Sequence, residues 1–152
     1  MGDVRQVAQS QVRDYMTANP QTLDVESTLL DAVLMMRRSE LRHIPILESG
    51  RLVGILTDRD VGRFAPSILM PLTAQDYNRV FEETPVKKVM TRKLVSTTPD
   101  ALLSEAVHLI HSLKLGCLPV LEHDRLVGII TVVDMLRALH DMMGDPGDGQ
   151  QA

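Results

Sequence analysis

Aromatic residues, cysteine and long apolar runs are scarce in this sequence, and each shortage excludes a class of function. The 152 residues include no Trp, two Phe and two Tyr, which leaves few rings on which single-stranded bases could stack. No apolar run approaches the roughly 18–20 residues of a membrane span, and the N-terminus lacks the apolar core of a signal peptide. The formal net charge of -4 disfavours a general polyanion binder. We therefore expect no nucleic-acid partner and no membrane.

The single cysteine, Cys117, cannot form an internal disulfide. This usage is typical of a reducing compartment, so we expect a cytoplasmic protein. We interpret Cys117 as a small buried filler, because a free cysteine behaves as an apolar residue. The apolar content of 44% is ordinary for a globular chain, and the length suits one compact domain or two small intertwined halves.

The chain contains an internal repeat. Residues 51–60 (RLVGILTDRD) return 74 positions later as residues 125–134 (RLVGIITVVD), and residues 12–62 align with 86–136 without a gap. Of these 51 aligned pairs, 17 are identical. Self-similarity at a fixed offset indicates a duplicated structural unit. The identical pairs include Met16 and Met90, Thr17 and Thr91, Ala32 and Ala106, Pro45 and Pro119, and Gly54 and Gly128.

Each copy predicts the order helix, strand, turn, strand, helix. An apolar helical face begins near Leu29 in the first copy and near Leu102 in the second, where Pro99 would occupy the first helical position. Two short apolar strands follow, and their prolines, Pro45 and Pro119, favour a strand start or a sheet edge. The glycine in the second strand indicates a bulge or a close approach of another backbone.

The segments outside the repeats carry weaker signals. Residues 1–11 are polar and expected to fray, and residues 73–81 predict a helix capped by Thr73. The domain boundaries that follow are residues 1–70 for repeat 1, 71–85 for a linker with a short helix, 86–144 for repeat 2, and 145–152 for a disordered tail. An apolar stripe on the last helix comprises Met135, Leu136, Leu139, Met142 and Met143.

Both copies end their second strand on Thr-x-x-Asp, which is Thr57 with Asp60 and Thr131 with Asp134. The threonine can cap the helix that begins there through its side-chain oxygen. A binding site is the alternative. The two copies keep both residues although the intervening pair differs, and this favours a site over a cap.

The doubled pattern h-P-h-h followed by G-h-h-T-x-x-D resembles the CBS domain pair, or Bateman module. The segments VRDYMT (12–17), TDRD (57–60) and Pro66-Ser67 are similar to small bacterial CBS proteins of the acetoin-utilisation type, here without room for an ACT domain. The resemblance implies an α/β (α+β) fold of two pseudo-twofold βαββα units packed sheet to sheet, with helices outside. It also implies adenine-nucleotide sites in the cleft between the repeats, for AMP, ADP, ATP or S-adenosylmethionine.

The chemistry of the repeated residues suits that ligand class. An ionised carboxylate can accept both hydroxyls of a ribose, so Asp60 and Asp134 are expected at the sugar, beside Thr57 and Thr131. Phosphates need cations, and Arg42, His43 and Arg59 of repeat 1 correspond to Gly116, Cys117 and Val133 of repeat 2. A solvated surface charge is the alternative for the arginines, and a partly buried imidazole for His43. The ligand-lining set that goes with the resemblance also includes Met16, Gln21, Leu41, Ile55, Val95, Leu115, Gly116, Cys117 and Ile129.

The sequence therefore predicts a regulatory sensor of adenine nucleotides that needs no cofactor and acts on an unknown regulated protein. The alternative is a dimeric scaffold with ligand-free clefts. No catalytic set can be assembled, so we do not expect an enzyme. His108 and His111 lack a third metal ligand at useful spacing. The apolar stripe predicts a homodimer. The resemblance to the CBS domain pair implies that the dimer forms through the helices that follow each T-x-x-D.

Overall fold

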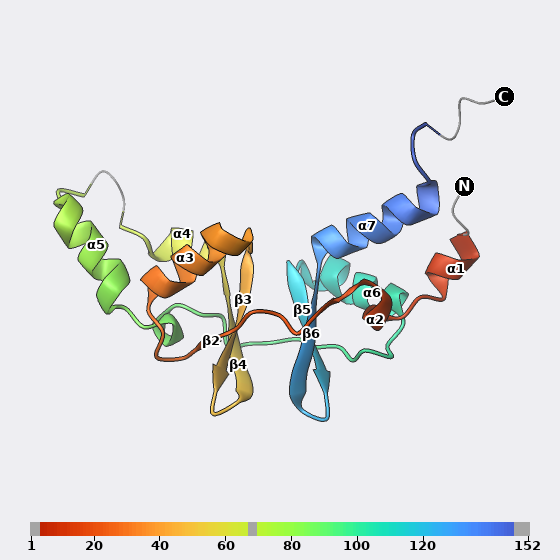
Figure 1. The fold of residues 1–152 in the computed structure, drawn as a ribbon, viewed down its shortest axis with the longest axis horizontal. Coiled ribbons are helices and arrows are strands. Elements are labelled where there is room, and N and C mark those ends of the chain that lie inside the picture. Colours follow the sequence, from red (N-terminus) through yellow and green to blue (C-terminus); the bar gives the residue numbers. More distant parts are fainter. Residues whose placement is uncertain (1–3, 67–69, 148–152) are drawn as a thin grey trace. The chain divides into compact units, whose positions relative to one another are not determined.

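The computed structural model describes residues 4–66 and 70–147, which divide into two compact units (Figure 1). We name each unit after the aspartate of its T-x-x-D turn. The Asp134 unit combines the residues up to Pro20 with those from Val95 onward, and the Asp60 unit spans Gln21–Leu94. The predicted fold class is confirmed, because each unit pairs helices with a small three-stranded sheet.

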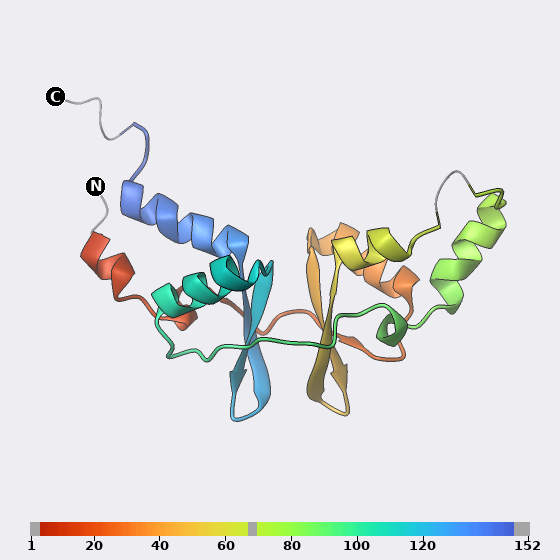
Figure 2. The ribbon, with the colours of Figure 1, turned by 180° about the vertical axis from the view of Figure 1, so that it is seen from behind.

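The Asp60 unit follows the order β–α–β–β–α. Strand β3 lies in the middle of its sheet, parallel to β2 and antiparallel to β4. Both ribbon views place α3 and α4 toward the end of the sheet opposite the β3–β4 turn (Figure 1, Figure 2). The elements are β2 (Leu23–Asp24), α3 (Leu29–Ser39), β3 (His43–Glu48), β4 (Arg51–Thr57), α4 (Asp58–Phe64), α5 (Ala74–Glu83) and the 3-10 turn Val86–Lys88.

The Asp134 unit repeats the hairpin and its flanking helices, but its sheet has the order β1-β6-β5, so that β6 lies in the middle and β1 is antiparallel to it. The hairpin of β5 and β6 keeps the register of the other unit: Cys117 pairs with Thr131 as His43 pairs with Thr57. The register shifts at the same place in both hairpins. The elements are α1 (Val4–Ala8), α2 (Val12–Tyr15), β1 (Thr17–Ala18), α6 (Leu103–Leu113), β5 (Cys117–Glu122), β6 (Arg125–Thr131) and α7 (Val132–Met143).

The compact units cut across the sequence repeats, because each repeat gives its leading segment to the other unit. Thr17 of repeat 1 pairs with Ile129 of repeat 2, and Thr91 of repeat 2 pairs with Ile55 of repeat 1. The contiguous boundaries that we drew from the repeat therefore differ from those of the compact units. The exchange depends on long-range strand pairing, which no local pattern encodes.

The signature glycines allow this exchange, and the expected close backbone approach is found. A Cβ atom built on Gly128 would lie 2.6 Å from Met16 Sδ and 3.1 Å from the Thr17 carbonyl oxygen. On Gly54 it would collide with Met90 and lie 3.1 Å from the Thr91 carbonyl oxygen. A side chain at either position would push the exchanged segment away from the sheet.

Each unit has its own apolar core, and the exchanged segment contributes to it. In the Asp134 unit Val12 is fully buried beside α6, β5 and β6, and in the Asp60 unit Val86 is fully buried beside α3, β3 and β4. Backbone bonds join the exchanged segments to these helices, since Leu103 N donates to Ser10 O and Leu29 N donates to Thr84 O. The exchanged segments are therefore integral parts of both cores.

Pro45 is placed differently from the sequence prediction. It is the third residue of β3, the central strand, and so lies at neither a strand start nor a sheet edge. It faces Ile55, whose amide and carbonyl bond Thr91 on the other side of β4, at 3.0 and 2.8 Å. The missing proline N–H therefore leaves no partner unsatisfied.

One predicted helix start is found in the structure and another is not. Thr73 caps α5 as expected, accepting from Asp76 N at 3.1 Å. The prediction for Pro99 is wrong, because α6 begins at Leu103. Residues expected to fray include Val4–Ala8, which form α1. Within the expected tail, residues 148–152 lie outside the described residues, as does Ser67.

Candidate functional site

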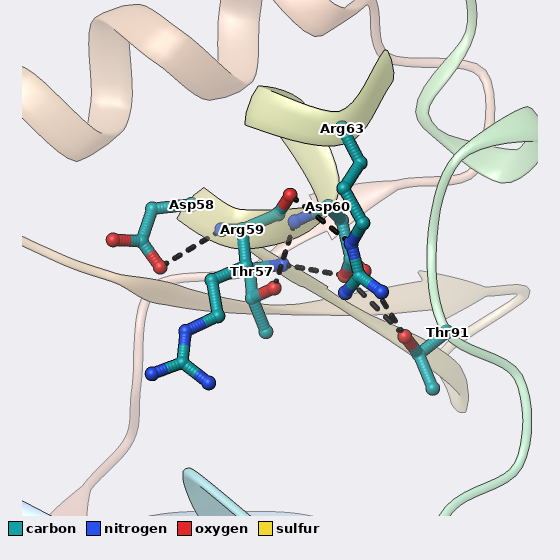
Figure 3. A network of polar contacts seen from close by, with 6 residues as sticks. All are labelled: Thr57, Asp58, Arg59, Asp60, Arg63 and Thr91. Carbon is teal, nitrogen blue, oxygen red and sulfur yellow. Dashed lines mark hydrogen bonds and ion pairs between the residues drawn. The ribbon is translucent and has the colours of Figure 1, made fainter.

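The T-x-x-D turn of the Asp60 unit joins β4 to α4 (Figure 3). Thr57 N donates to Asp60 Oδ2 at 3.0 Å, and Asp60 N donates to Thr57 Oγ1 at 3.1 Å. The two residues thus form a capping box, in which each side chain satisfies the other's amide. The capping interpretation is therefore confirmed for Thr57 and Asp60, which together cap the start of α4.

Asp60 has two further partners besides this box (Figure 3). Arg63 Nη2 lies 3.3 Å from Asp60 Oδ1. The Thr91 hydroxyl donates to both carboxylate oxygens, at 3.4 Å to Oδ1 and 3.3 Å to Oδ2. The Asp60 side chain is only 8% exposed. A charged group at this depth needs such partners to offset its lost hydration.

The Asp134 unit builds the same box with different surroundings. Thr131 N donates to Asp134 Oδ2 at 2.8 Å, and the Thr131 hydroxyl donates to the same oxygen at 3.1 Å. Arg137 Nη2 lies 3.6 Å from Asp134 Oδ1, and the same nitrogen donates to the Tyr15 carbonyl oxygen at 2.7 Å. Asp134 is 14% exposed. Its carboxylate is therefore the more accessible of the two.

A group of charged side chains surrounds the start of α4. Arg42 and Arg59 are exposed and His43 is half-buried. Burial is the main cause that lowers the pKa of His43 below its usual 6.5; Arg42 and Arg59 lower it further, whereas Asp58 raises it. Asp58 N also donates to Arg42 O at 3.0 Å, which ties the start of α4 to the start of β3. The structure thus brings the three predicted cations together.

The matched positions of the Asp134 unit carry no charge. Val132 N donates to Gly116 O at 3.1 Å, so the backbone connection is the same. Cys117 is buried, and burial raises the pKa of its thiol to about 12. Val133 is 68% exposed. The thiol is therefore protonated and unreactive at neutral pH, which agrees with its interpretation as a filler.

The other predicted ligand-lining residues divide between the units. Ile55 and Ile129 are buried strand residues that pair with the exchanged threonines. Gln21 is exposed and hydrogen-bonds Ser39 at 2.9 Å. Four half-buried residues complete the set: Leu41 in the Asp60 unit, and Met16, Val95 and Leu115 in the Asp134 unit.

Sequence reasoning missed several side chains around the carboxylates. Thr91 was recognised as an identical partner of Thr17, but its contact with Asp60 arises from the exchange of segments. Arg63 and Arg137 are three residues after the two aspartates, and this spacing could have revealed them as helix neighbours. Tyr15, whose hydroxyl donates to Asp141 at 2.8 Å, gave no signal in the sequence.

A surface groove of about 680 Å³ lies apart from the predicted site residues. It borders α1, α2 and α7 of the Asp134 unit. There the Cζ atom of Arg137 lies over the Tyr15 ring, 5.4 Å from the ring centroid. The polar contacts there join α7 to the exchanged segment. We interpret the groove as the outer margin of this packing.

Two kinds of site are not found in the part of the chain that the structure describes. Residues 4–66 and 70–147 contain no group of three or more acidic, histidine or cysteine side chains that could hold a metal ion. Within the same ranges, no helix is both long and apolar enough to cross a membrane.

Comparisons with known proteins agree with the fold. Among curated relatives, the CBS domain-containing protein YhcV of Bacillus subtilis is 33% identical over 126 residues, covering 83% of each chain. A solved structure from Vibrio cholerae, provisionally assigned as an acetoin utilization protein (AcuB), is 33% identical with a TM-score of 0.72 and covers 91% of this chain and 99% of that one.

Two further solved structures, each 23% identical, share the fold and contain ligands. CBSX2 in complex with AMP has a TM-score of 0.74 over 88% of this chain and 99% of that one. The CBS domain pair of protein MJ0100, in complex with 5′-methylthioadenosine and S-adenosyl-L-methionine, has a TM-score of 0.70 over 86% and 95%. A family model described as CBS domain matches residues 12–66 and 86–141, more than half of the chain, so this protein belongs to the CBS domain family.

Proposed function

We propose that this CBS domain pair is a regulatory module that binds an adenine nucleotide and transmits the binding to a partner protein, without catalysing a reaction. The observation that carries the proposal is the largely buried carboxylate found in both T-x-x-D turns, with two arginines and a histidine gathered beside one of them. The binding of AMP by CBSX2 and of S-adenosylmethionine by the MJ0100 pair supports this ligand class. A cytoplasmic location fits the single, unreactive Cys117.

The carboxylates are assigned to the ribose. An ionised carboxylate is a pure acceptor with about four lone-pair sites, so it can take two vicinal hydroxyls while its other positions serve the cap. Asp134 Oδ1 is suited to this, because the hydrogen bonds from the Thr131 amide and hydroxyl both end on Oδ2. The threonine hydroxyls of the two turns lie beside the carboxylates and can add a further contact.

The cations of the Asp60 unit are assigned to phosphate. Arg42, His43 and Arg59 would interact with a nucleotide tail, since guanidinium groups form strong charge-assisted bonds with phosphate oxygens. S-adenosylmethionine carries a positive sulfonium, which these arginines would repel. We therefore assign a phosphate-bearing nucleotide to the Asp60 unit, and only weak adenosine-like binding to the Asp134 unit, whose matched positions are uncharged.

A thermal-shift panel tests the ligand class. AMP, ADP, ATP, adenosine and S-adenosylmethionine are compared, with GMP as the base control. A ligand present at about 100 times its Kd stabilises the folded state by about 2.7 kcal/mol, which is a clear rise in melting temperature. At least one adenine compound should raise it while GMP does not. If none does, the nucleotide sensor is rejected in favour of the scaffold.

We also propose that the chain forms a homodimer through the helices that follow T-x-x-D. On α7 the side chains of Leu136, Leu139 and Met143 are 57%, 47% and 70% exposed, and they form one face of the helix. Met135 instead packs against the core of its own unit. An apolar face of this kind is typical of a protein interface.

Light scattering tests the dimer. The wild type should give twice the chain mass of 16.9 kDa, and Leu136→Glu should give the monomer. Leu72→Glu is the matched control, because Leu72 is a comparably exposed leucine (41%) outside these helices. A wild type that is monomeric at micromolar concentration would exclude this arrangement.

A further inference from the structure

The two T-x-x-D carboxylates have the same capping bond but differ in how many acceptor positions are occupied. Asp60 Oδ2 accepts from Thr57 N and from the Thr91 hydroxyl, while Asp60 Oδ1 faces Arg63 and the same hydroxyl. These contacts use most of the roughly four lone-pair sites of a carboxylate.

Asp134 has fewer contacts on one of its oxygens. The Thr131 amide and hydroxyl both donate to Oδ2, and among the described residues Oδ1 accepts no hydrogen bond and has only the ion pair with Arg137, at 3.6 Å. Thr17 is the counterpart of Thr91, 74 positions earlier, but among the described residues its hydroxyl makes no hydrogen bond with Asp134. The repeats share the threonine, and only one repeat uses it against the carboxylate.

We propose that the Thr91 hydroxyl is an internal competitor of a ribose diol at Asp60, and so sets the ligand specificity of this unit. The inference rests on the proposed function, in which Asp60 is a ribose carboxylate. In the free protein the hydroxyl occupies both oxygens that the diol would take. A ligand must displace it before the sugar can bind.

The geometry makes this displacement feasible. The Thr91 contacts of 3.3 and 3.4 Å are longer than the 2.5–3.0 Å of ordinary O–H···O bonds, and one proton is shared between two acceptors. The Thr91 backbone is held by Ile55, with bonds of 2.8 and 3.0 Å, so only the side chain has to rotate. The side chain is exposed, and its freed hydroxyl can bond water.

The competition would favour nucleotides over nucleosides. A bare nucleoside gains little by exchanging one hydroxyl for another at Asp60. A nucleotide adds contacts between its phosphate and Arg42, His43 or Arg59, which stand near Asp60 in the same unit. The threonine therefore raises the requirement for a phosphate in the Asp60 unit, whereas the Asp134 unit has no such requirement.

The alternative is that Thr91 merely holds Asp60 in a binding geometry, and the two roles predict opposite signs. Removing a competitor strengthens binding of a diol ligand, and removing a support weakens it. The competitor role also requires the effect to depend on the diol. Adenosine and 2′,3′-dideoxyadenosine differ only in those hydroxyls, so together they isolate this dependence.

Calorimetric titration of both nucleosides tests the proposal on Thr91→Val, Thr91→Ser and the matched control Thr17→Val. Thr91→Val should bind adenosine about twofold to tenfold more tightly than the wild type, which corresponds to one ordinary hydrogen bond. Its affinity for 2′,3′-dideoxyadenosine should not change. Thr91→Ser keeps the hydroxyl and should match the wild type, as should Thr17→Val. The gain should vanish when Asp60→Asn is added.

The possible failures are distinguishable. If the wild type binds adenosine or AMP but Thr91→Val binds adenosine equally or more weakly, the competitor is rejected and the proposed function stands. An equal gain for 2′,3′-dideoxyadenosine also rejects it. If no adenine compound binds the wild type or any variant, the proposed function falls and this inference falls with it. Circular dichroism melting of each variant confirms that it is folded, and Thr91→Ala, which removes the same hydroxyl, replaces Thr91→Val should that variant unfold.

Discussion

The Asp60 and Asp134 units share a backbone and differ in chemistry. Both have the same hairpin register and the same position of the register shift. In both, the residue after the first helix has a left-handed backbone conformation: Glu40 (φ 53°) and Lys114 (φ 55°). The Asp60 unit places Arg42, His43 and Arg59 around its turn, whereas the Asp134 unit replaces them with Gly116, Cys117 and Val133. The duplicated framework therefore tolerates exchange of the side chains beside T-x-x-D.

The second difference lies in how the helix after T-x-x-D is attached. Helix α4 ends at Phe64, whereas α7 runs to Met143. The longer helix carries Arg137 and Asp141, which hold Tyr15 of the exchanged segment by its carbonyl and its hydroxyl. In the Asp134 unit, polar contacts to Tyr15 therefore attach the exchanged segment to α7. The residue that corresponds to Tyr15 in the Asp60 unit is Val89, which has no polar side chain.

Substituting the signature glycine should have the largest effect and should harm both units alike. Gly128→Val introduces a Cβ that would lie 2.6 Å from Met16 Sδ and 3.1 Å from the Thr17 carbonyl oxygen, and two methyl groups beyond it. We expect a loss of about 1–3 kcal/mol in the free energy of unfolding, as for an overpacked core. Gly54→Val should lose a comparable amount, and urea denaturation measures both.

Gly62→Ala is the control for this pair, because a Cβ at Gly62 meets nothing within 4 Å. Gly62 lies inside α4, so alanine should leave stability unchanged or increase it by up to about 1 kcal/mol. If Gly128→Val were as harmless as Gly62→Ala, the close approach of the exchanged segment would not contribute to stability.

Tyr15→Phe should affect only the Asp134 unit. It removes the hydroxyl that donates to Asp141 at 2.8 Å in a partly buried place. We expect a loss of about 0.5–1.5 kcal/mol in the free energy of unfolding. Tyr77→Phe is the control, because the Tyr77 hydroxyl has no hydrogen bond to any residue that the structure describes and its ring packs on Phe81 at 5.2 Å. Equal losses from both substitutions would show that the Asp141 contact adds nothing.

The pH dependence of the free energy of unfolding should show a smaller effect, which comes from His43 and is confined to the Asp60 unit. The pKa of His43 is lowered in the folded state, mainly by burial, so its neutral form contributes stability above pH 6.5 that is lost as the pH falls through the folded pKa. Phosphate binding through protonated His43 would strengthen as the pH falls toward the lowered pKa of the free protein.

Thermal melts between pH 7.5 and 5 measure this contribution. His43→Gln should lose less stability on acidification than the wild type does. His111→Gln, an exposed histidine on α6, should behave as the wild type. An unchanged acid response of His43→Gln would show that His43 does not titrate differently in the folded and unfolded states.

Local patterns predicted much of the fold because they record local physics. The short apolar runs predicted the hairpin strands, and Thr57 and Thr131 marked the helix starts through their capping oxygens. The identity of Gly54 and Gly128 correctly indicated a close backbone approach, although not which segment approaches.

The sequence could not reveal contacts created by the exchange. Thr91 meets Asp60 because a segment of repeat 2 pairs with β4, and this is a long-range choice. The start of α6 was misplaced for a similar reason: the Leu103 amide is satisfied by Ser10 O, from the other repeat, and not by a local cap. Sequence reasoning treated site and cap as alternatives at T-x-x-D, but capping leaves acceptor positions available for a ligand.

The central claim is that cations beside one T-x-x-D turn recognise a nucleotide phosphate. Calorimetric titration with AMP and with adenosine tests it most directly, on the wild type and on the double variant Arg42→Gly with Arg59→Val. The double variant gives the Asp60 unit the uncharged residues of its counterpart, and Arg51→Ala is the control for lost surface charge. The wild type should bind AMP at least about tenfold more tightly than adenosine, since charge-assisted bonds contribute roughly 1.5–3 kcal/mol. The double variant should lose that preference and keep adenosine binding. Failure of the wild type to bind AMP, or an AMP preference that survives the double substitution, would contradict the account.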